Sequence, residues 1–328
     1  MNSNKIHKCI TTLFFSFILF ALIIINSSPS FAVEEIKDIP YKTEQNQTLL
    51  LDIYKPNITA SKPSPVVVYI HGGSWTAGDK SVIHSDFHEN VLTEFLKNGF
   101  TVVSIDYSLT TAENIHFPRP IQDCKDAVRW VRKNAQKYNF DPNNIGLWGT
   151  SAGAHLALLI AYSDDTEFAG TKDLKNYSSK VNYVINDFGP TELTKLLRPT
   201  ITGLGLYTLE KMDPQICQKR EDKLKSLFGP QYYPEKKQLK ELCEVYSPLI
   251  IINKNAVPTL TFHGVEDKLV PVSQATLLHK SLNKNNVPNQ LVEYKDLSHG
   301  FKNISSKNLD DLIIKTIYFA KKYSSIEN

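Results

Sequence analysis

The chain has 328 residues, 41% of them hydrophobic, and this length suits one large α/β domain or two smaller ones. Its formal net charge is +3, and leaving out Lys5 and Lys8, which lie in a predicted leader, gives 35 basic and 34 acidic residues. A balance this close to neutral argues against a nucleic-acid or anionic-membrane partner.

The first 32 residues have the pattern of a signal peptide. Lys5 and Lys8 form a basic start, Leu13–Ile25 is a predominantly apolar run, and Ser30 and Ala32 place small residues at a cleavage site. The run is shorter than the roughly 20 residues of a spanning helix. We expect export to the periplasm or the medium, with cleavage after Ala32 and no stable membrane span afterwards. The alternative is an uncleaved N-terminal anchor.

Seven short runs rich in β-branched residues alternate with longer helical patterns over residues 33–328. This alternation predicts an α/β domain with a mostly parallel central sheet flanked by helices, because strands buried on both faces are almost entirely apolar. The expected strands are Thr48–Tyr54, Val66–Ile70, Thr101–Asp106, Ile145–Trp148, Val181–Asn186, Thr259–His263 and Gln290–Tyr294.

Apolar residues recur at helical spacing in five segments between or after these strands. The expected helices are His84–Lys97, Pro120–Lys137, Ser151–Tyr162, Ser273–Lys284 and Leu309–Lys322. The interval from about residue 189 to 258 has no strand pattern, and a structureless loop of that length is improbable inside a compact domain. We expect a helical cap insertion there. A disordered insertion is the alternative, which the frequent Leu, Ile, Tyr and Phe disfavour.

The run Gly149-Thr150-Ser151-Ala152-Gly153 lies between an expected strand and an expected helix. A sharp turn at that junction exposes the serine at the carboxyl edge of the sheet, and flanking glycines let the backbone turn without a clash. Ser151 is therefore the predicted nucleophile. The alternative is that Ser151 only caps the helix.

A second glycine-containing run, His71-Gly72-Gly73-Ser74-Trp75, directly follows the expected strand Val66–Ile70. Its backbone N–H groups are suited to an oxyanion hole, which we predict to consist of Gly72, Gly73 and Ala152. Trp75 is the predicted substrate-binding residue. The alternative is a plain glycine turn in which His71 is a loop histidine without a catalytic role.

Asp267 follows the strand Thr259–His263, and His299 follows the strand Gln290–Tyr294, so the chain order is serine, acid, histidine. This is the order of the α/β-hydrolase fold. We predict that His299 is the general base toward Ser151 and that Asp267 orients it. Glu266, Asp296 and Asp187 are weaker candidates for the acid; His155 and His263 are expected to be packed core histidines.

After removal of the leader, which contains Cys9, the chain retains Cys124, Cys217 and Cys243. An oxidising compartment permits one disulfide, for which Cys217 and Cys243 are the candidate pair. None of the three has the short paired spacing of a zinc site, so we expect no metal.

With these residues assembled, the chain resembles bacterial α/β-hydrolase carboxylesterases related to hormone-sensitive lipase, including the feruloyl- and acetyl-esterase-like branch. The resemblance covers nearly all of residues 33–328. Beyond the predicted triad, its motifs are Leu51-Asp52-Ile53-Tyr54-Lys55-Pro56, Gly78-Asp79-Lys80, Asp106-Tyr107, Asp126-Ala127-Val128-Arg129-Trp130, Asp141-Pro142 and Ser247-Pro248. Two positions depart from the family pattern: Ser108 stands where arginine is frequent, and Ala154 where a second glycine is frequent.

The resemblance implies a serine carboxylesterase that acts on a small-molecule ester, with short-to-medium acyl or acetyl groups, without any cofactor. Three alternatives remain open. The histidine-glycine-glycine-serine-tryptophan run also resembles kynurenine formamidase, an amidase of the same fold; a prolyl-oligopeptidase-like peptidase is a second enzyme alternative, and a ligand-binding protein on a hydrolase fold is a non-enzyme one. The physiological substrate and the oligomeric state do not follow from the sequence.

Overall fold

The structure is a computed structural model that describes residues 33–44, 46–56, 62–202, 204–212, 215–233 and 235–324. Residues Val33–Asn328 form one compact unit. The predicted signal peptide, residues 1–32, lies outside the described residues, so its cleavage stays a prediction.

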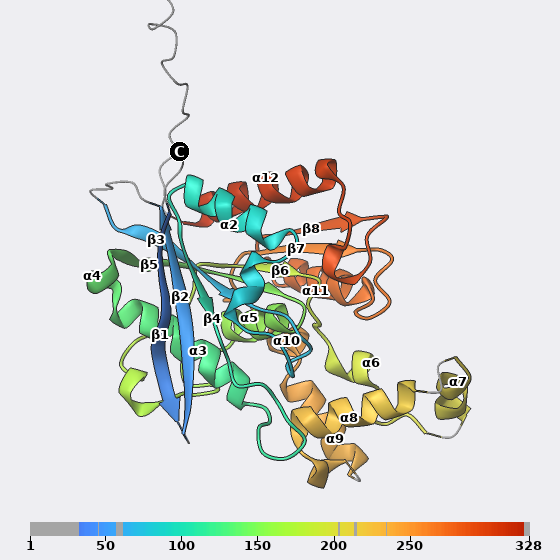
Figure 1. Ribbon diagram of the computed structural model, residues 1–328. Coiled ribbons are helices and arrows are strands. Elements are labelled where there is room, and N and C mark those ends of the chain that lie inside the picture. The colour runs from blue at the N-terminus through green and yellow to red at the C-terminus, as the bar shows by residue number, and fades with distance from the viewer. Residues whose placement is uncertain are drawn as a thin grey trace, which may run out of the picture. The chain divides into compact units, whose positions relative to one another are not determined.

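One eight-stranded sheet runs through this unit in the order β1-β2-β4-β3-β5-β6-β7-β8 (Figure 1). β1 and β2 are antiparallel to each other, as are β2 and β4, and all other neighbours are parallel. The strands are β1 Val33–Glu44, β2 Gln47–Pro56, β3 Ser64–Ile70, β4 Thr101–Ile105, β5 Phe140–Thr150, β6 Tyr183–Asp187, β7 Thr259–Gly264 and β8 Asn289–Tyr294. The predicted mostly parallel sheet is confirmed.

Helices cover both faces of the sheet. The core on one face contains side chains of α2 and α12, whereas the core on the other contains side chains of α3, α5 and α11. The helices outside the interval from 189 to 258 are α2 His88–Lys97, α3 Arg119–Lys133, α4 Ala135–Tyr138, α5 Ala152–Tyr162, α11 Ser273–Lys284 and α12 Ser306–Tyr323, with 3-10 turns η1 Lys80–His84, η2 Lys172–Leu174 and η4 His299–Phe301. All five predicted helices are present, the second divided into α3 and α4.

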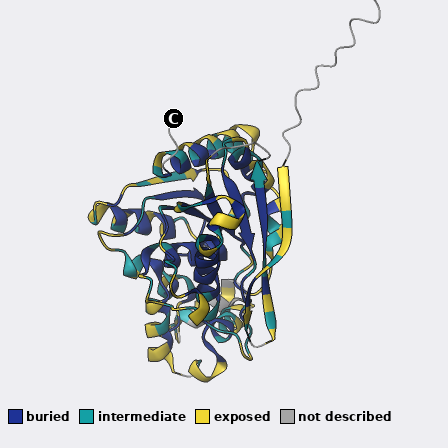
Figure 2. Cartoon of the chain, turned by 90° about the vertical axis from the view of Figure 1, so that its left-hand side faces the viewer, coloured by how far each residue is buried: buried dark blue, intermediate teal, exposed yellow. Residues whose placement is uncertain are grey.

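The edge strand β1 was not predicted. Most of its residues are exposed, and its pairing register with β2 shifts between Pro40 and Lys42, so it lacks the apolar signal of the inner strands (Figure 2). Lys42 fastens this strand to α3: its ammonium group lies 2.7 Å from Asp123 Oδ1 and 3.0 Å from Asp126 Oδ2, with all three side chains buried. The backbone N–H of Ser108 donates to the other Asp123 oxygen, at 3.0 Å.

The interval between β6 and β7 is helical, and its described residues contain no strand. Its helices are α6 Leu193–Leu197, α7 Leu204–Met212, α8 Ile216–Phe228, α9 Lys236–Val245 and α10 Pro248–Ile251, with a 3-10 turn η3 at Pro230–Tyr232. Leu224, Leu227 and Phe228 of α8 are buried and belong to the main core on the α3 and α5 side. The interval is therefore packed against the sheet domain through an apolar face of α8.

Cys217 on α8 and Cys243 on α9 are not joined by a disulfide, contrary to the candidate pairing, and Cys124 and Cys243 are buried thiols. In the part of the chain that the structure describes, no helix is long and apolar enough to cross a membrane.

Candidate active site

Ser151 lies at the junction of β5 and α5 with φ +52° and ψ −118°, a backbone conformation that residues with a side chain rarely adopt. Two glycines make this turn sterically possible. A methyl group on Gly153 would lie 2.0 Å from the Ile70 carbonyl oxygen, and one on Gly149 would lie 2.6 Å from the Gly153 oxygen. The Ser151 N–H donates to the backbone oxygen of Asp187 at 2.9 Å, which fixes the turn to β6.

His299 and Asp267 reach Ser151 from the two neighbouring strands at the far edge of the sheet. His299 begins η4 after β8, and Asp267 lies in the loop after β7; the carboxyl ends of parallel strands meet at one edge. The Ser151 Oγ is 2.9 Å from His299 Nε2, and His299 Nδ1 is 2.7 Å from Asp267 Oδ2. The structure thus brings together the three predicted triad residues in a continuous hydrogen-bonded chain.

The carboxylate of Asp267 is held by several donors. Its Oδ1 accepts from the backbone N–H groups of Leu269 (2.9 Å) and Val270 (2.8 Å). Burial raises the pKa of Asp267, but hydrogen bonds from His263, His299 and Val270 outweigh burial and hold that pKa well below its usual range. A carboxylate only accepts hydrogen bonds, so His299 Nδ1 carries the proton and Nε2 is left to accept from the Ser151 hydroxyl.

Sequence reasoning missed the second histidine on this carboxylate. His263 Nε2 is 3.5 Å from Asp267 Oδ2 and 2.7 Å from the Val270 carbonyl oxygen, and its side chain is fully buried. The four-residue spacing of His263 and Asp267 was the available signal. Asp267 is therefore bracketed by two imidazoles, of which only His299 reaches Ser151.

The loop after β3 lies directly against the nucleophile. A methyl group on Gly72 would lie 3.3 Å from the Ser151 Cβ, so there is no room for a larger residue between this predicted oxyanion loop and the serine. Gly73, Ser74 and Trp75 all have positive φ, of +114°, +54° and +64°. Gly72 therefore lies near Ser151, which precedes Ala152 at the N-terminus of α5, and the oxyanion role of Gly72, Gly73 and Ala152 stays a prediction.

The run of positive φ values turns the Trp75 ring into the protein interior. Only 4% of the residue is exposed, its indole N–H donates to His155 Nδ1 at 3.3 Å, and its ring meets Phe117 edge-on. His155 Nε2 donates to the Tyr246 carbonyl oxygen at 2.8 Å, and burial lowers the His155 pKa to about 4. His155 is a core histidine. Trp75 packs inside the protein under the oxyanion loop, so little of the Trp75 surface is left for the predicted contact with substrate.

The other residues considered as catalytic candidates lie outside the hydrogen-bonded chain of the triad. His71 is buried, stacks on Tyr107 with ring centroids 4.3 Å apart, and has a pKa lowered by burial to about 4. Asp187 is buried next to the turn at Ser151. Its Oδ2 accepts a hydrogen bond from Trp148 Nε1 at 2.7 Å, and burial raises its pKa to about 7. Glu266 is exposed, beside the buried Asp267.

The protein has the strand order of an α/β-hydrolase and a serine at the sharp turn after β5. Its acid and its histidine follow β7 and β8, the last two strands. These features define the protein as an α/β-hydrolase. The chain belongs to the BD-FAE family, whose model matches residues 51–282.

Individual relatives agree with this assignment. The chain is 26% identical over 255 residues to "Esterase LipC" of Mycobacterium tuberculosis, an alignment that covers 77% of this chain and 57% of LipC. It spans about half the length of the curated relatives it matches.

Two solved structures are similar in fold. A "Truncated form of carbohydrate esterase from gut microbiota" has a TM-score of 0.68 at 20% identity, covering 90% of this chain and 98% of that one. The propionate-bound esterase Est2 of Thermogutta terrifontis has a TM-score of 0.66 at 22% identity, covering 92% and 98%. At these identities, the likeness is one of fold.

Proposed function

We propose that the protein is a serine carboxylesterase that hydrolyses small-molecule esters with short-to-medium acyl or acetyl groups. The observation that carries the proposal is the hydrogen-bonded chain from Ser151 Oγ through His299 to Asp267, with distances of 2.9 and 2.7 Å. The names of its relatives, which include several esterases, support the same reaction.

In the proposed reaction, the Ser151 Oγ attacks the ester carbonyl carbon while His299 Nε2 takes the hydroxyl proton. Asp267 holds the imidazole in the required tautomer and stabilises the imidazolium that forms. His299 then gives its proton to the leaving alkoxide, an alcohol departs, and an acyl-serine remains. Water, deprotonated by the same imidazole, hydrolyses that ester and restores Ser151.

The negative oxygen of each tetrahedral intermediate would lie beside Gly72, Gly73 and the first turn of α5. Losing one donor of an oxyanion hole costs about 2.7–4 kcal/mol of transition-state stabilisation. The closeness of Gly72 to Ser151, with 3.3 Å from a methyl group built on Gly72 to the serine Cβ, supports this placement.

The test of the proposal is removal of the nucleophile. Ser151→Ala should abolish hydrolysis of 4-nitrophenyl acetate and butyrate, and a fluorophosphonate probe should label the wild-type protein but not this variant. Ser281→Ala, on α11, is the control and should keep both activities. Full esterase activity in Ser151→Ala would overturn the proposal.

Assays on the same purified protein distinguish the esterase from a formamidase, a peptidase and a ligand-binding protein. A formamidase-like or peptidase-like enzyme would cleave N-formylkynurenine or a prolyl peptide amide faster than any ester, measured as kcat/KM. A ligand-binding protein on this fold would take no fluorophosphonate label and cleave neither esters nor amides. A hydrogen-bonded serine, histidine and aspartate favour the enzyme.

We also propose that the protein is exported and that residues 1–32 are removed. The basic start, the apolar run and the small residues before Val33 support this. Mass spectrometry of protein secreted by, or released from the periplasm of, an expressing bacterium should give an N-terminus at Val33. An intact Met1 in a membrane fraction would instead show a retained anchor.

A further inference from the structure

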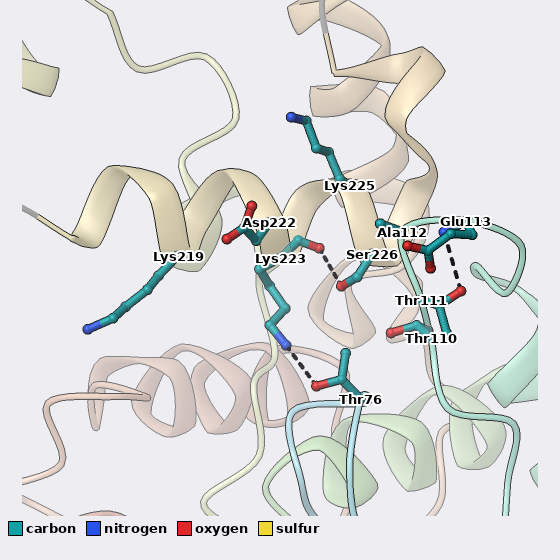
Figure 3. Close-up of a pocket in the computed structure, with 10 residues that line it drawn as sticks. All are labelled: Thr76, Thr110, Thr111, Ala112, Glu113, Lys219, Asp222, Lys223, Lys225 and Ser226. Atoms are coloured by element: carbon teal, nitrogen blue, oxygen red, sulfur yellow. Dashed lines mark hydrogen bonds between the residues drawn. The ribbon is translucent and has the colours of Figure 1, made fainter.

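A pocket of about 510 Å³ opens beside the predicted oxyanion loop (Figure 3). Three segments line it: Thr76 from that loop, residues 110–113, and the face of α8 that includes Lys223. Ser151 does not line the pocket, but Thr76 is only four residues from Gly72, and a methyl group on Gly72 would lie 3.3 Å from the Ser151 Cβ. The pocket is thus placed where a part of an ester remote from the reacting bond could lie.

Lys223 is the charged group that points toward the oxyanion loop. Its Nζ donates to the Ser74 carbonyl oxygen at 2.8 Å, lies 3.5 Å from Thr76 Oγ1 and lies 5.8 Å from the centre of the Trp75 ring. Among the described residues, no carboxylate lies within ion-pair distance of this ammonium group, and burial lowers its pKa to about 8. A half-buried cation without an anion is costly, and an anionic ligand would remove that cost.

The other charged groups in the lining are arranged differently. Lys225 pairs with Glu221 on α8, and Figure 3 shows its side chain directed away from Thr76. Asp222 accepts from Gln218 at 2.7 Å. The lining carries three lysines and two carboxylates, a net charge of +1, so a singly charged anion fits this pocket better than a doubly charged one.

The pocket walls are fixed to one another before any ligand arrives. The Thr110 N–H donates to the Trp75 carbonyl oxygen at 2.8 Å, and the Phe117 N–H donates to the Leu227 carbonyl oxygen of α8 at 2.9 Å. The hydrogen bond from Lys223 to Ser74 joins α8 to the oxyanion loop in the same way. Each of the three segments is thus bonded to the other two without a substrate. A preformed polar site loses little conformational entropy on binding.

We propose that this pocket is a subsite for a carboxylate group carried by the ester substrate, an inference that rests on the proposed esterase function. The ammonium group of Lys223 has three N–H donors, two of which face Ser74 and Thr76, so one remains for the ligand. Thr76 Oγ1 accepts from Lys223 and keeps its own hydroxyl proton to donate. The enzyme would thus prefer esters with a carboxylate in the acyl or the alcohol half.

The experiment compares matched ester pairs. In the acyl arm, 4-nitrophenyl hydrogen glutarate is compared with neutral 4-nitrophenyl valerate; in the alcohol arm, 4-acetoxybenzoate is compared with 4-acetoxybenzamide. The rate without enzyme is subtracted. The ratio of kcat/KM for the anionic ester to that for the neutral ester should exceed one in one arm, and that arm identifies the half of the ester that enters the pocket.

Lys223→Met should lower this ratio about 10- to 100-fold, the range expected for losing a hydrogen bond to a charged group. Lys223→Arg should retain most of the preference. Lys240→Met is the matched charge control: Lys240 lies on α9 outside the pocket lining and pairs with Glu244, and its variant should leave the ratio within about twofold. Lys223→Gln and thermal unfolding of each variant guard against a folding defect.

An unchanged ratio in Lys223→Met and Lys223→Gln, or an equal fall in Lys240→Met, would overturn the subsite while leaving the esterase proposal intact. If the wild-type protein hydrolysed none of the four esters, the esterase proposal would fail, and the subsite with it.

Discussion

Replacing Asp267 by asparagine tests whether Asp267 sets the tautomer in which His299 accepts the Ser151 proton. The asparagine oxygen can still accept the backbone N–H groups of Leu269 and Val270, which now meet Asp267 Oδ1. The amide NH₂ then takes the place of Oδ2 and meets the Nδ1–H of His299, donor against donor. His299 should therefore adopt the other tautomer, with its proton on Nε2 facing Ser151.

In that tautomer, the imidazole cannot accept the Ser151 proton, so the loss should far exceed that of one hydrogen bond. Replacing the triad aspartate of a serine protease by asparagine lowers kcat by about 10⁴, and the same arrangement here predicts a fall of similar size, or about 5.5 kcal/mol. The barrier should rise without a comparable change in KM, because Asp267 is buried away from the substrate.

The assay is steady-state hydrolysis of 4-nitrophenyl butyrate by Asp267→Asn, with circular dichroism to verify folding. Glu266→Gln is the matched control, since Glu266 is the exposed neighbour of Asp267 and should keep wild-type kcat. Retention of more than about a tenth of the wild-type kcat in Asp267→Asn would refute the assignment of Asp267. A large loss in Glu266→Gln would reassign the acid.

Two further predictions concern stability. Lys42→Met should lower the free energy of unfolding in urea by about 1–3 kcal/mol, because Asp123 and Asp126 lose the buried cation that they share but each keeps an arginine at 3.2–3.3 Å; an unchanged midpoint would show that β1 is not held to α3 by charge. Burial raises the pKa of Asp187 to about 7, above the value of about 4 in an unfolded chain. The folded state therefore binds this proton more tightly than the unfolded state does. The free energy of unfolding should fall as the pH rises from about 4 to about 7. Asp187→Asn should remove that part of the pH dependence in urea titrations, and parallel curves for variant and wild type would contradict it.

The inner strands could be predicted because burial on both faces forces a nearly continuous apolar sequence, as in Val66–Ile70, which is fully buried. β1 could not, because an edge strand pairs on one side only and needs no apolar pattern. The start of β5 was also missed: Phe140–Asn144 has the residues of a turn, with Pro142 among them, yet it extends the strand.

The triad residues were accessible to sequence reasoning because each follows a strand, and strand ends converge. The features that depend on distant packing were not accessible. Trp75 was expected at the substrate, but three successive positive φ values and a bond to His155 direct it inward. Lys223 lies 72 residues after Ser151 on a helix whose docking no local pattern reveals; only the structure brings its ammonium group to Ser74.

The turn around Ser151 is enclosed by main chain. Gly149 and Gly153 each face backbone atoms at 2.0–2.6 Å from where a methyl group would sit, and Gly72 faces the Thr150 oxygen at 3.1 Å. Main chain cannot be exchanged by mutation as a side chain can, so this turn has almost no freedom to drift. Substrate choice can change more freely through the exposed positions of α8 and residues 110–113, which line the pocket, and a mutant library directed at those positions would sample new specificities while keeping most of its members folded.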